Sequence, residues 1–218
     1  MTLPPPRLLR ALDRFHAGRP WDHNAHFHPW VLRQLRPRVG SVLDVGCGSG
    51  DLARSLAARA GRVDGVDADP AITARARELT PAALPVTYLV AEAPTGLPER
   101  SYDVITCVAV LHHLPFTEAL EAFRERLAPG GTLVVVGVSK QRAPVDHLLG
   151  TVSIPLNVLM ALLKNRGRRA ARPASMTAPT RQPDMTFPEI ARGARALLPG
   201  ARLRRRLFWR YTLVWQRR

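Results

Sequence analysis

The chain has 218 residues, a length that suits one folded domain with room for a cap or an insertion. Hydrophobic residues make up 46% of it, which is enough to fill a core and excludes a disordered chain. The net charge of +15 lies mostly in residues 141–218, which hold 16 basic and 3 acidic residues against 16 and 14 in residues 1–140. Arginine supplies nearly all of this excess and can reflect genome composition, so the charge leaves an anionic partner open without requiring one.

The beginning of the chain is rich in proline, arginine and histidine. Its first 30 residues contain no long apolar run, which disfavours a secretory signal. The two cysteines, Cys47 and Cys107, lie in glycine-rich or apolar segments and indicate no disulfide framework, so we expect a cytoplasmic protein. Apolar spacing predicts a short helix within residues 1–19 and a second helix that ends at Pro37.

From residue 41 onward, short apolar segments alternate with helical patterns. The expected strands are 41–45, 62–66, 86–90, 102–108 and 132–138, and the expected helices are 51–60, 70–79 and 118–127. Gly61 is expected to stop the first of these helices, and Pro129 to Gly131 the third. Such alternation predicts a parallel sheet with right-handed crossovers.

Residues 187–198 predict a further helix, and residues 202–215 a closing antiparallel hairpin. The fold class is therefore α/β: a Rossmann-like, doubly wound sheet of seven strands with the last antiparallel, plus a cap and a lid. The expected parts are an N-terminal helical cap (1–38), a cofactor-binding core (39–140), a lid insertion (141–185), and a helix and hairpin that complete the sheet (186–218).

The sharpest motif is Asp-Val-Gly-Cys-Gly-Ser-Gly at residues 44–50, between the first strand and its helix. Alternate glycines let the chain turn tightly and bring its backbone against a ligand, and the following helix offers free N–H groups. A dinucleotide fingerprint would need a third glycine where Asp51 stands, and an aspartate there would repel a pyrophosphate. Asp44 instead suits a ligand with a positive group, such as S-adenosylmethionine.

With these residues the chain resembles the class I methyltransferases, especially small quinone- and natural-product-type members. Five segments in the family's order carry the resemblance: 42–50, 65–70, 91–98, 101–114 and 126–133. The resemblance covers about residues 40–138. The resemblance implies S-adenosylmethionine as cofactor and these binding residues: Asp44, Gly46, Cys47, Gly48, Gly50, Asp67, Ala68, Glu92, Ala93 and Val108.

The resemblance also implies a role for each binding residue. The glycines would pass under the methionyl part with Asp44 near its ammonium, and Val108 would lie beside the methionyl chain. Asp67 would accept the ribose hydroxyls and Ala68 touch the adenine face. Glu92, where the family more often has aspartate, and the Ala93 N–H would read the adenine edge. Singly, Asp67 could instead cap a helix and Glu92 could be a solvated carboxylate.

Methyl transfer depends mainly on alignment, and a general base is needed only for a hydroxyl or a protonated amine. His112 and His113 follow the fourth strand and are the candidate catalytic bases, unless they only shape the loop. The cap supplies possible contacts to cofactor or acceptor through Asn24, His26, His28 and Arg33. A zinc site is disfavoured because the cap histidines have no cysteine partners, so no metal is assigned.

Residues 148–163 form an uncharged run of sixteen residues, too short for a membrane span and interrupted by Pro155 and Asn157. We expect a lid helix that starts near Pro155 and roofs a pocket for a small hydrophobic acceptor. Because basic residues follow directly, residues 148–172 are also a candidate for peripheral membrane contact.

Nucleic acid is disfavoured as a partner, because no aromatic residue accompanies the charge of residues 166–181. The sequence after the fourth strand, Cys-Val-Ala-Val at 107–110, also lacks an N-methylating Asn/Asp-Pro-Pro motif. The favoured function is methyl transfer from S-adenosylmethionine to a small acceptor, at oxygen before carbon or nitrogen. The alternatives are an RNA methyltransferase and an inactive cofactor-binding regulatory protein.

Overall fold

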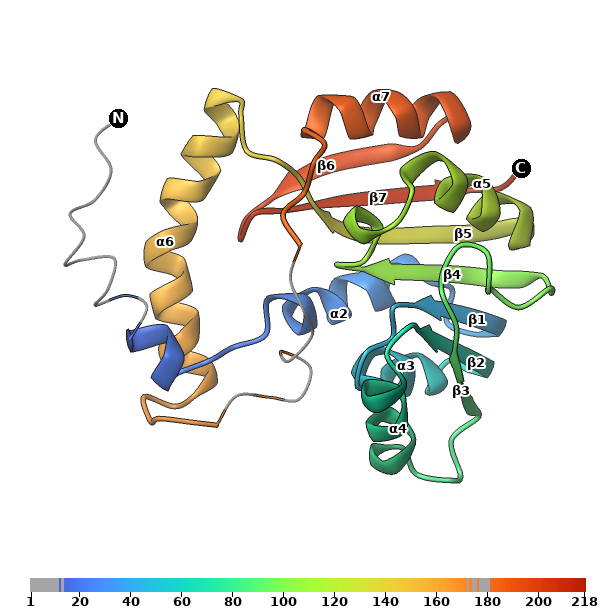
Figure 1. The fold of residues 1–218 in the computed structure, drawn as a ribbon, viewed down its shortest axis with the longest axis horizontal. Coiled ribbons are helices and arrows are strands. Elements are labelled where there is room, and N and C mark those ends of the chain that lie inside the picture. The colour runs from blue at the N-terminus through green and yellow to red at the C-terminus, as the bar shows by residue number, and fades with distance from the viewer. Residues whose placement is uncertain (1–11, 13, 172, 174–175, 177–180) are drawn as a thin grey trace.

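The computed structural model describes residues 12, 14–171, 173, 176 and 181–218, and most of the predicted first helix lies outside them. Seven strands form one sheet in the order β3-β2-β1-β4-β5-β7-β6 (Figure 1). Their bounds are β1 Val39–Val45, β2 Ala60–Asp67, β3 Val86–Val90, β4 Tyr102–Val108, β5 Leu127–Val138, β6 Arg202–Arg206 and β7 Arg210–Gln216. The first five strands are parallel, and β7 is antiparallel to both neighbours. The predicted seven-stranded fold is confirmed.

Helices cover both faces of the sheet, as they must when the strands are apolar on both sides. Alternate residues of β5 show the division, because Leu133 and Val135 pack in one cluster while Val134 and Val136 pack in the other. The first cluster includes residues of α5 (Phe116–Arg126) and α7 (Phe187–Leu197). The second includes residues of α2 (His23–Gln34), α3 (Asp51–Ala57) and α4 (Pro70–Leu79).

Two of the predicted helix stops are wrong. Helix α3 ends at Ala57, and Gly61 lies within β2 instead of stopping the helix. Strand β5 begins at Leu127, so Pro129 to Gly131 belong to the strand. The reason is tertiary: Gly130 N–H donates to the Arg217 carbonyl and Arg217 N–H to that of Gly131, which extends the pairing to the end of the chain.

Helix α6 (Pro144–Lys164) begins eleven residues before the predicted start near Pro155, which lies inside it. The true start has its own signals. Pro144 occupies the first turn, and the Asp146 carboxylate accepts the N–H groups of Arg142 and Ala143 at 3.2 and 2.9 Å. The helix stands beyond the edge of the sheet at which β4 ends (Figure 1).

The register aligns the carboxyl ends of the central strands. Val45 pairs with both Val66 and Cys107, and Asp67 pairs with Val90. The chain order reverses between β1 and β4, which makes this edge the topological switch point where open α/β sheets bind ligands.

Candidate active site

The glycine turn connects β1 to α3 at the carboxyl edge. The N–H groups of Gly46 and Cys47 donate to the Val66 carbonyl at 2.7 and 3.1 Å, so the turn is fixed to β2. Gly46, Gly48 and Gly50 all have positive φ, at 71°, 51° and 79°. The turn therefore needs glycine for its backbone conformation.

Two of these glycines face different surroundings. A Cβ on Gly46 would lie 2.0 Å from Cγ2 of Val110, so the missing side chain lets the loop after β4 approach closely. A Cβ on Gly48 would meet nothing within 4 Å. Gly48 therefore presents bare backbone to open space, where a ligand can approach it.

Asp44, at the end of β1, is 2% exposed. Its Oδ1 accepts a hydrogen bond from the Thr106 hydroxyl at 2.7 Å, and its Oδ2 has no partner among the described residues. Burial raises the pKa of this carboxyl to about 7; the Thr106 hydrogen bond opposes the shift and the charge of Asp67 adds to it. A buried carboxylate oxygen without a partner is suited to a cationic group such as the ammonium of S-adenosylmethionine.

Asp67 ends β2 beside the turn. Its Oδ2 accepts the Gly48 N–H at 2.9 Å and its Oδ1 the Asp69 N–H at 3.1 Å. Each carboxylate oxygen has a second lone pair, so the half-exposed group can still accept ribose hydroxyls. The cap of α4 is Asp69, which accepts from Ala71 N–H and Ile72 N–H, so Asp67 is not needed there.

The remaining predicted cofactor residues lie at the same edge. Ala68 and Glu92 are exposed, while Ala93 and Val108 are half-buried. The Ala91 N–H donates to the Asp67 carbonyl at 3.0 Å, which places the segment after β3 beside the end of β2. The ends of β2 and β3 therefore lie side by side at this edge.

His112 and His113 form the 3₁₀ helix η1 (Leu111–His113) just after β4. Their rings lie 4.0 Å apart between centroids, and Nδ1 of His112 is buried without a partner. Burial lowers the pKa of His112 to about 4, with smaller contributions from the charges of His113, Arg210 and Arg181. His112 is therefore neutral at physiological pH. Its ring is half-buried, whereas the ring of His113 is exposed.

The cap residues differ in their surroundings. Asn24 accepts a hydrogen bond from Arg210 at 2.9 Å, and burial lowers the pKa of half-buried His28. His26 packs edge-on against the rings of Trp21 and Phe208. Arg33, in the last turn of α2, is exposed. The cap contacts to cofactor or acceptor stay a prediction, and only Asn24 is joined directly to another residue of the edge.

Arg210 is a site residue that the sequence analysis missed. It begins β7, paired with Val138 at the end of β5, so the antiparallel strand brings it to the carboxyl edge. Burial lowers the pKa of its guanidinium to about 10, and its Nε has no partner among the described residues. No local motif identifies it, because its position depends on strand order.

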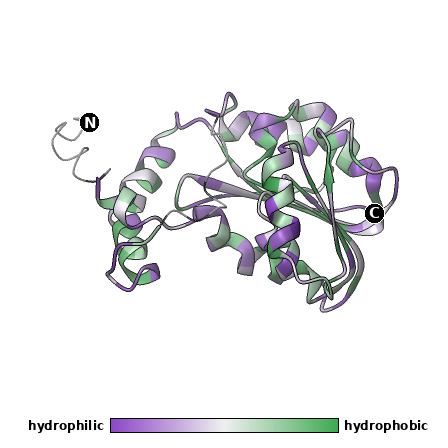
Figure 2. Cartoon of the chain, turned by 60° about the horizontal axis from the view of Figure 1, so that its bottom comes forward, coloured by the Kyte–Doolittle hydropathy of each residue, from purple (hydrophilic) through white to green (hydrophobic). Residues whose placement is uncertain are grey.

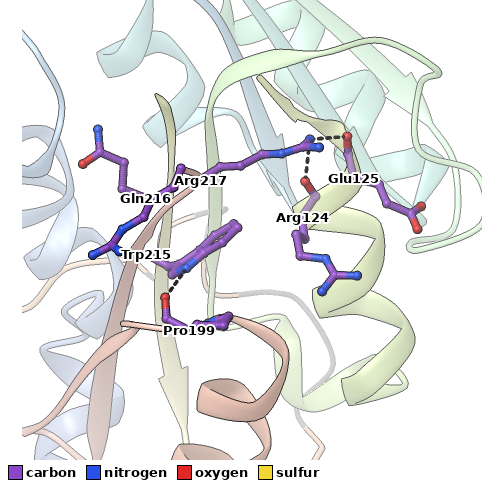
Figure 3. A pocket seen from close by; sticks show the side chains of 7 residues that line it. Arg124, Glu125, Pro199, Trp215, Gln216 and Arg217 are labelled. Atoms are coloured by element: carbon purple, nitrogen blue, oxygen red, sulfur yellow. Dashed lines mark hydrogen bonds between the residues drawn. The ribbon is translucent and has the colours of Figure 1, made fainter. Parts of the chain in front are cut away.

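A hollow lies away from this edge (Figure 3). Arg124, Glu125, Pro199 and Trp215 are among the residues that line it. The Arg217 guanidinium donates to the carbonyls of Arg124 and Glu125, both at 3.0 Å, and so satisfies the end of α5. These contacts stabilise the fold.

Comparisons with known proteins identify the relatives of this chain. Residues 42–131 match a family model described as a methyltransferase domain. An uncharacterized methyltransferase of Mycobacterium tuberculosis is 33% identical over 203 residues, covering 91% of this chain and 98% of that protein. A ubiquinone biosynthesis O-methyltransferase of Pseudomonas fluorescens is 28% identical over 193 residues, covering 80% of this chain and 81% of that protein.

Solved structures show the same fold. An N-methyltransferase from Bradyrhizobium japonicum has a TM-score of 0.59 at 17% identity, covering 88% of this chain and 95% of that chain. Magnesium protoporphyrin IX methyltransferase from Synechocystis has a TM-score of 0.57 at 16% identity, covering 100% of this chain and 90% of that chain. Together with the full-length relative and the matched domain, they show that the chain belongs to the class I S-adenosylmethionine-dependent methyltransferases.

Proposed function

We propose that this enzyme methylates a hydroxyl group on a small, mainly apolar acceptor. The observation that carries the proposal is the position of the buried side-chain nitrogens and oxygens that lack a partner. Among the described residues there are three, Asp44 Oδ2, His112 Nδ1 and Arg210 Nε. All three lie at the carboxyl edge, on β1, after β4 and at the start of β7. Buried polar atoms are rarely left unpaired in folded proteins, which supports these three atoms as groups that a bound ligand would meet.

The three atoms divide the edge into two parts. Asp44 and the glycine turn would hold S-adenosylmethionine, which supplies a methyl group on a sulfonium when bound. His112 and Arg210 lie on the other side of β4 and would face the acceptor. The neutral imidazole of His112 can accept the proton of a hydroxyl, and the positive charge of Arg210 favours the oxygen that becomes negative.

Similarity to other proteins also supports oxygen as the acceptor atom. The ubiquinone biosynthesis O-methyltransferases of Paraburkholderia xenovorans and Pseudomonas fluorescens are 33% and 28% identical over their matched regions. Their names describe transfer to oxygen. A phenolic hydroxyl suits transfer to oxygen, and its apolar ring suits the apolar side chains of Val108 and Val110 near the edge. Cytoplasmic location stays part of this proposal, consistent with Cys47 and Cys107, which are both free and buried.

The test is turnover with catechol and 4-alkylcatechols, measured as methyl ether and S-adenosylhomocysteine formed. His112→Asn should lower kcat roughly a hundredfold, the usual loss for a general base, while the matched variant His113→Asn should change it far less because that ring is exposed. The acidic limb of the wild-type kcat/KM profile should lie near pH 4, where burial places the pKa of His112. Methylation of amines alone, with no ether formed, would contradict the proposal.

A further inference from the structure

Helix α6 has two faces with opposite surroundings. Asp146, Ser153 and Ala161 are buried on one of them. We define the apolar face of α6 as the opposite set of residues: Val145, Leu148, Val152, Leu159, Leu162 and Leu163. Successive members are one to seven residues apart, chiefly at the three- and four-residue spacing of one helix face, and their exposed fractions run from 37% to 64%. Figure 2 shows apolar residues along this helix, at the left of the molecule.

This face holds most of the large hydrophobic residues that are exposed in the described part of the chain. Nine large hydrophobic residues are exposed in the part of the chain that the structure describes, and six of them form the apolar face of α6. Single exposed hydrophobic residues need no explanation, but a contiguous apolar stripe indicates an interaction site.

The buried face holds α6 to the rest of the fold. Asp146 accepts from Arg205 at 2.7 Å, Ser153 Oγ from the Phe208 N–H at 2.8 Å, and the Asn157 amide oxygen lies 2.9 Å from Nε2 of His23. By length and composition, α6 is the one helix among the described residues that could cross a membrane. Crossing would break all of these contacts, so the geometry favours a helix that lies along a surface.

The charge at the end of the helix selects the partner. Lys164, Arg166, Arg168 and Arg169 follow the apolar face, are exposed, and form no ion pair within the described residues. The sequence has no acidic residue between Asp146 and Asp184, and Asp146 is already paired with Arg205. A second copy of α6 could therefore cover the apolar face but could not neutralise the basic end. Anionic lipid headgroups can do so beside an apolar layer.

We propose that α6 docks this methyltransferase on an anionic membrane surface, with its apolar face among the upper acyl chains and residues 164–169 at the headgroups. The helix is about 30 Å long at 1.5 Å per residue and would lie in the plane of the membrane. The apolar face is the side of α6 opposite its buried residues, so the proposal does not depend on the identity of the acceptor.

The test is co-sedimentation of the full-length protein with vesicles of phosphatidylcholine alone or mixed with phosphatidylglycerol. We expect binding to the mixed vesicles that falls as salt is added. Val152→Gln should lower the partition coefficient roughly tenfold, because it removes one buried apolar side chain from the membrane layer. Ile154→Gln is the matched control: both residues are 43% exposed, but position 154 lies off the apolar face.

Two controls separate the alternatives. Calorimetry with S-adenosylmethionine should give the same affinity for Val152→Gln as for the wild type, which shows that the variant is folded. Sedimentation velocity measures the oligomeric state of both. The proposal would be overturned if Val152→Gln and Ile154→Gln lost vesicle binding equally, or if the wild type bound neutral vesicles as well as the mixed ones. It would also be overturned if the wild type were a dimer that does not bind vesicles and that dissociates in Val152→Gln.

Discussion

At the scale of single residues, Asp44 shows how burial sets the chemistry of the site. Thr106 donates to one oxygen of its carboxyl, the other has no partner within the described residues, and burial raises its pKa to about 7. Ionising it without a positive partner costs folding free energy. A group that destabilises the protein alone but meets a cationic ligand is a feature of a binding site.

Asp44→Asn tests this interpretation. Above pH 7 and without cofactor, the variant should be more heat-stable than the wild type. The pKa of Asp44 is raised in the folded protein, so the wild type loses folding free energy as pH rises toward and through 7 and this carboxyl ionises. Its affinity for S-adenosylmethionine should fall at least tenfold. Calorimetry and thermal unfolding at pH 8 measure both. Asp69→Asn, which keeps the cap of α4, should change neither; unchanged affinity in Asp44→Asn would show that the carboxylate does not meet the cofactor.

At the scale of elements, the glycine turn depends on two different requirements. Gly46 lets the loop carrying Val110 pack against the turn, whereas Gly48 leaves space on the ligand side. Both have positive φ, so an alanine at either position carries strain of roughly 1 kcal/mol. Of these two positions, only Gly46 is one where a new methyl group would also collide with a neighbour.

Gly46→Ala should therefore unfold at a clearly lower temperature than Gly48→Ala. Adding Val110→Ala to Gly46→Ala should recover part of the loss, because it removes the two methyl groups nearest the new Cβ. Gly48→Ala should instead weaken cofactor binding more than it lowers stability. Thermal unfolding and calorimetry on the four proteins check the order. Equal stability of the two single variants would mean that the contact with Val110 does not limit the turn.

At the scale of the whole molecule, α6 and the N-terminal segment are joined through buried polar groups. His23 lies 2.9 Å from the Asn157 amide oxygen, and its ring packs near Trp21 and Phe208. Burial, with a contribution from the charge of Arg210, lowers the pKa of His23 to about 4. The unfolded chain therefore binds a proton at His23 at pH values where the folded protein does not.

The expected effect is acid destabilisation with a defined window. The stability that neutral His23 contributes is complete above its ordinary pKa of 6.5 and is lost as pH falls toward 4. His23→Gln should shrink the fall in the urea midpoint between pH 6.5 and 4.5, because glutamine can reach Asn157 without titrating. His147→Gln is the control on an exposed residue of α6. An unchanged slope in His23→Gln would show that other groups dominate acid unfolding.

The sequence by itself determined the sheet, the glycine turn and the strand ends at which the predicted cofactor residues lie. Those features rest on local patterns: short apolar segments that alternate with helical ones, alternate glycines, and carboxylates at the ends of strands. The start of β5, the unpartnered nitrogen of Arg210 and the two faces of α6 were decided only by tertiary structure. Each depends on residues far apart in the chain, such as Gly130 with Arg217, Val138 with Arg210, and Asn157 with His23. Local sequence cannot encode these pairings, because the order of strands sets which residues meet and which buried atoms remain unpaired.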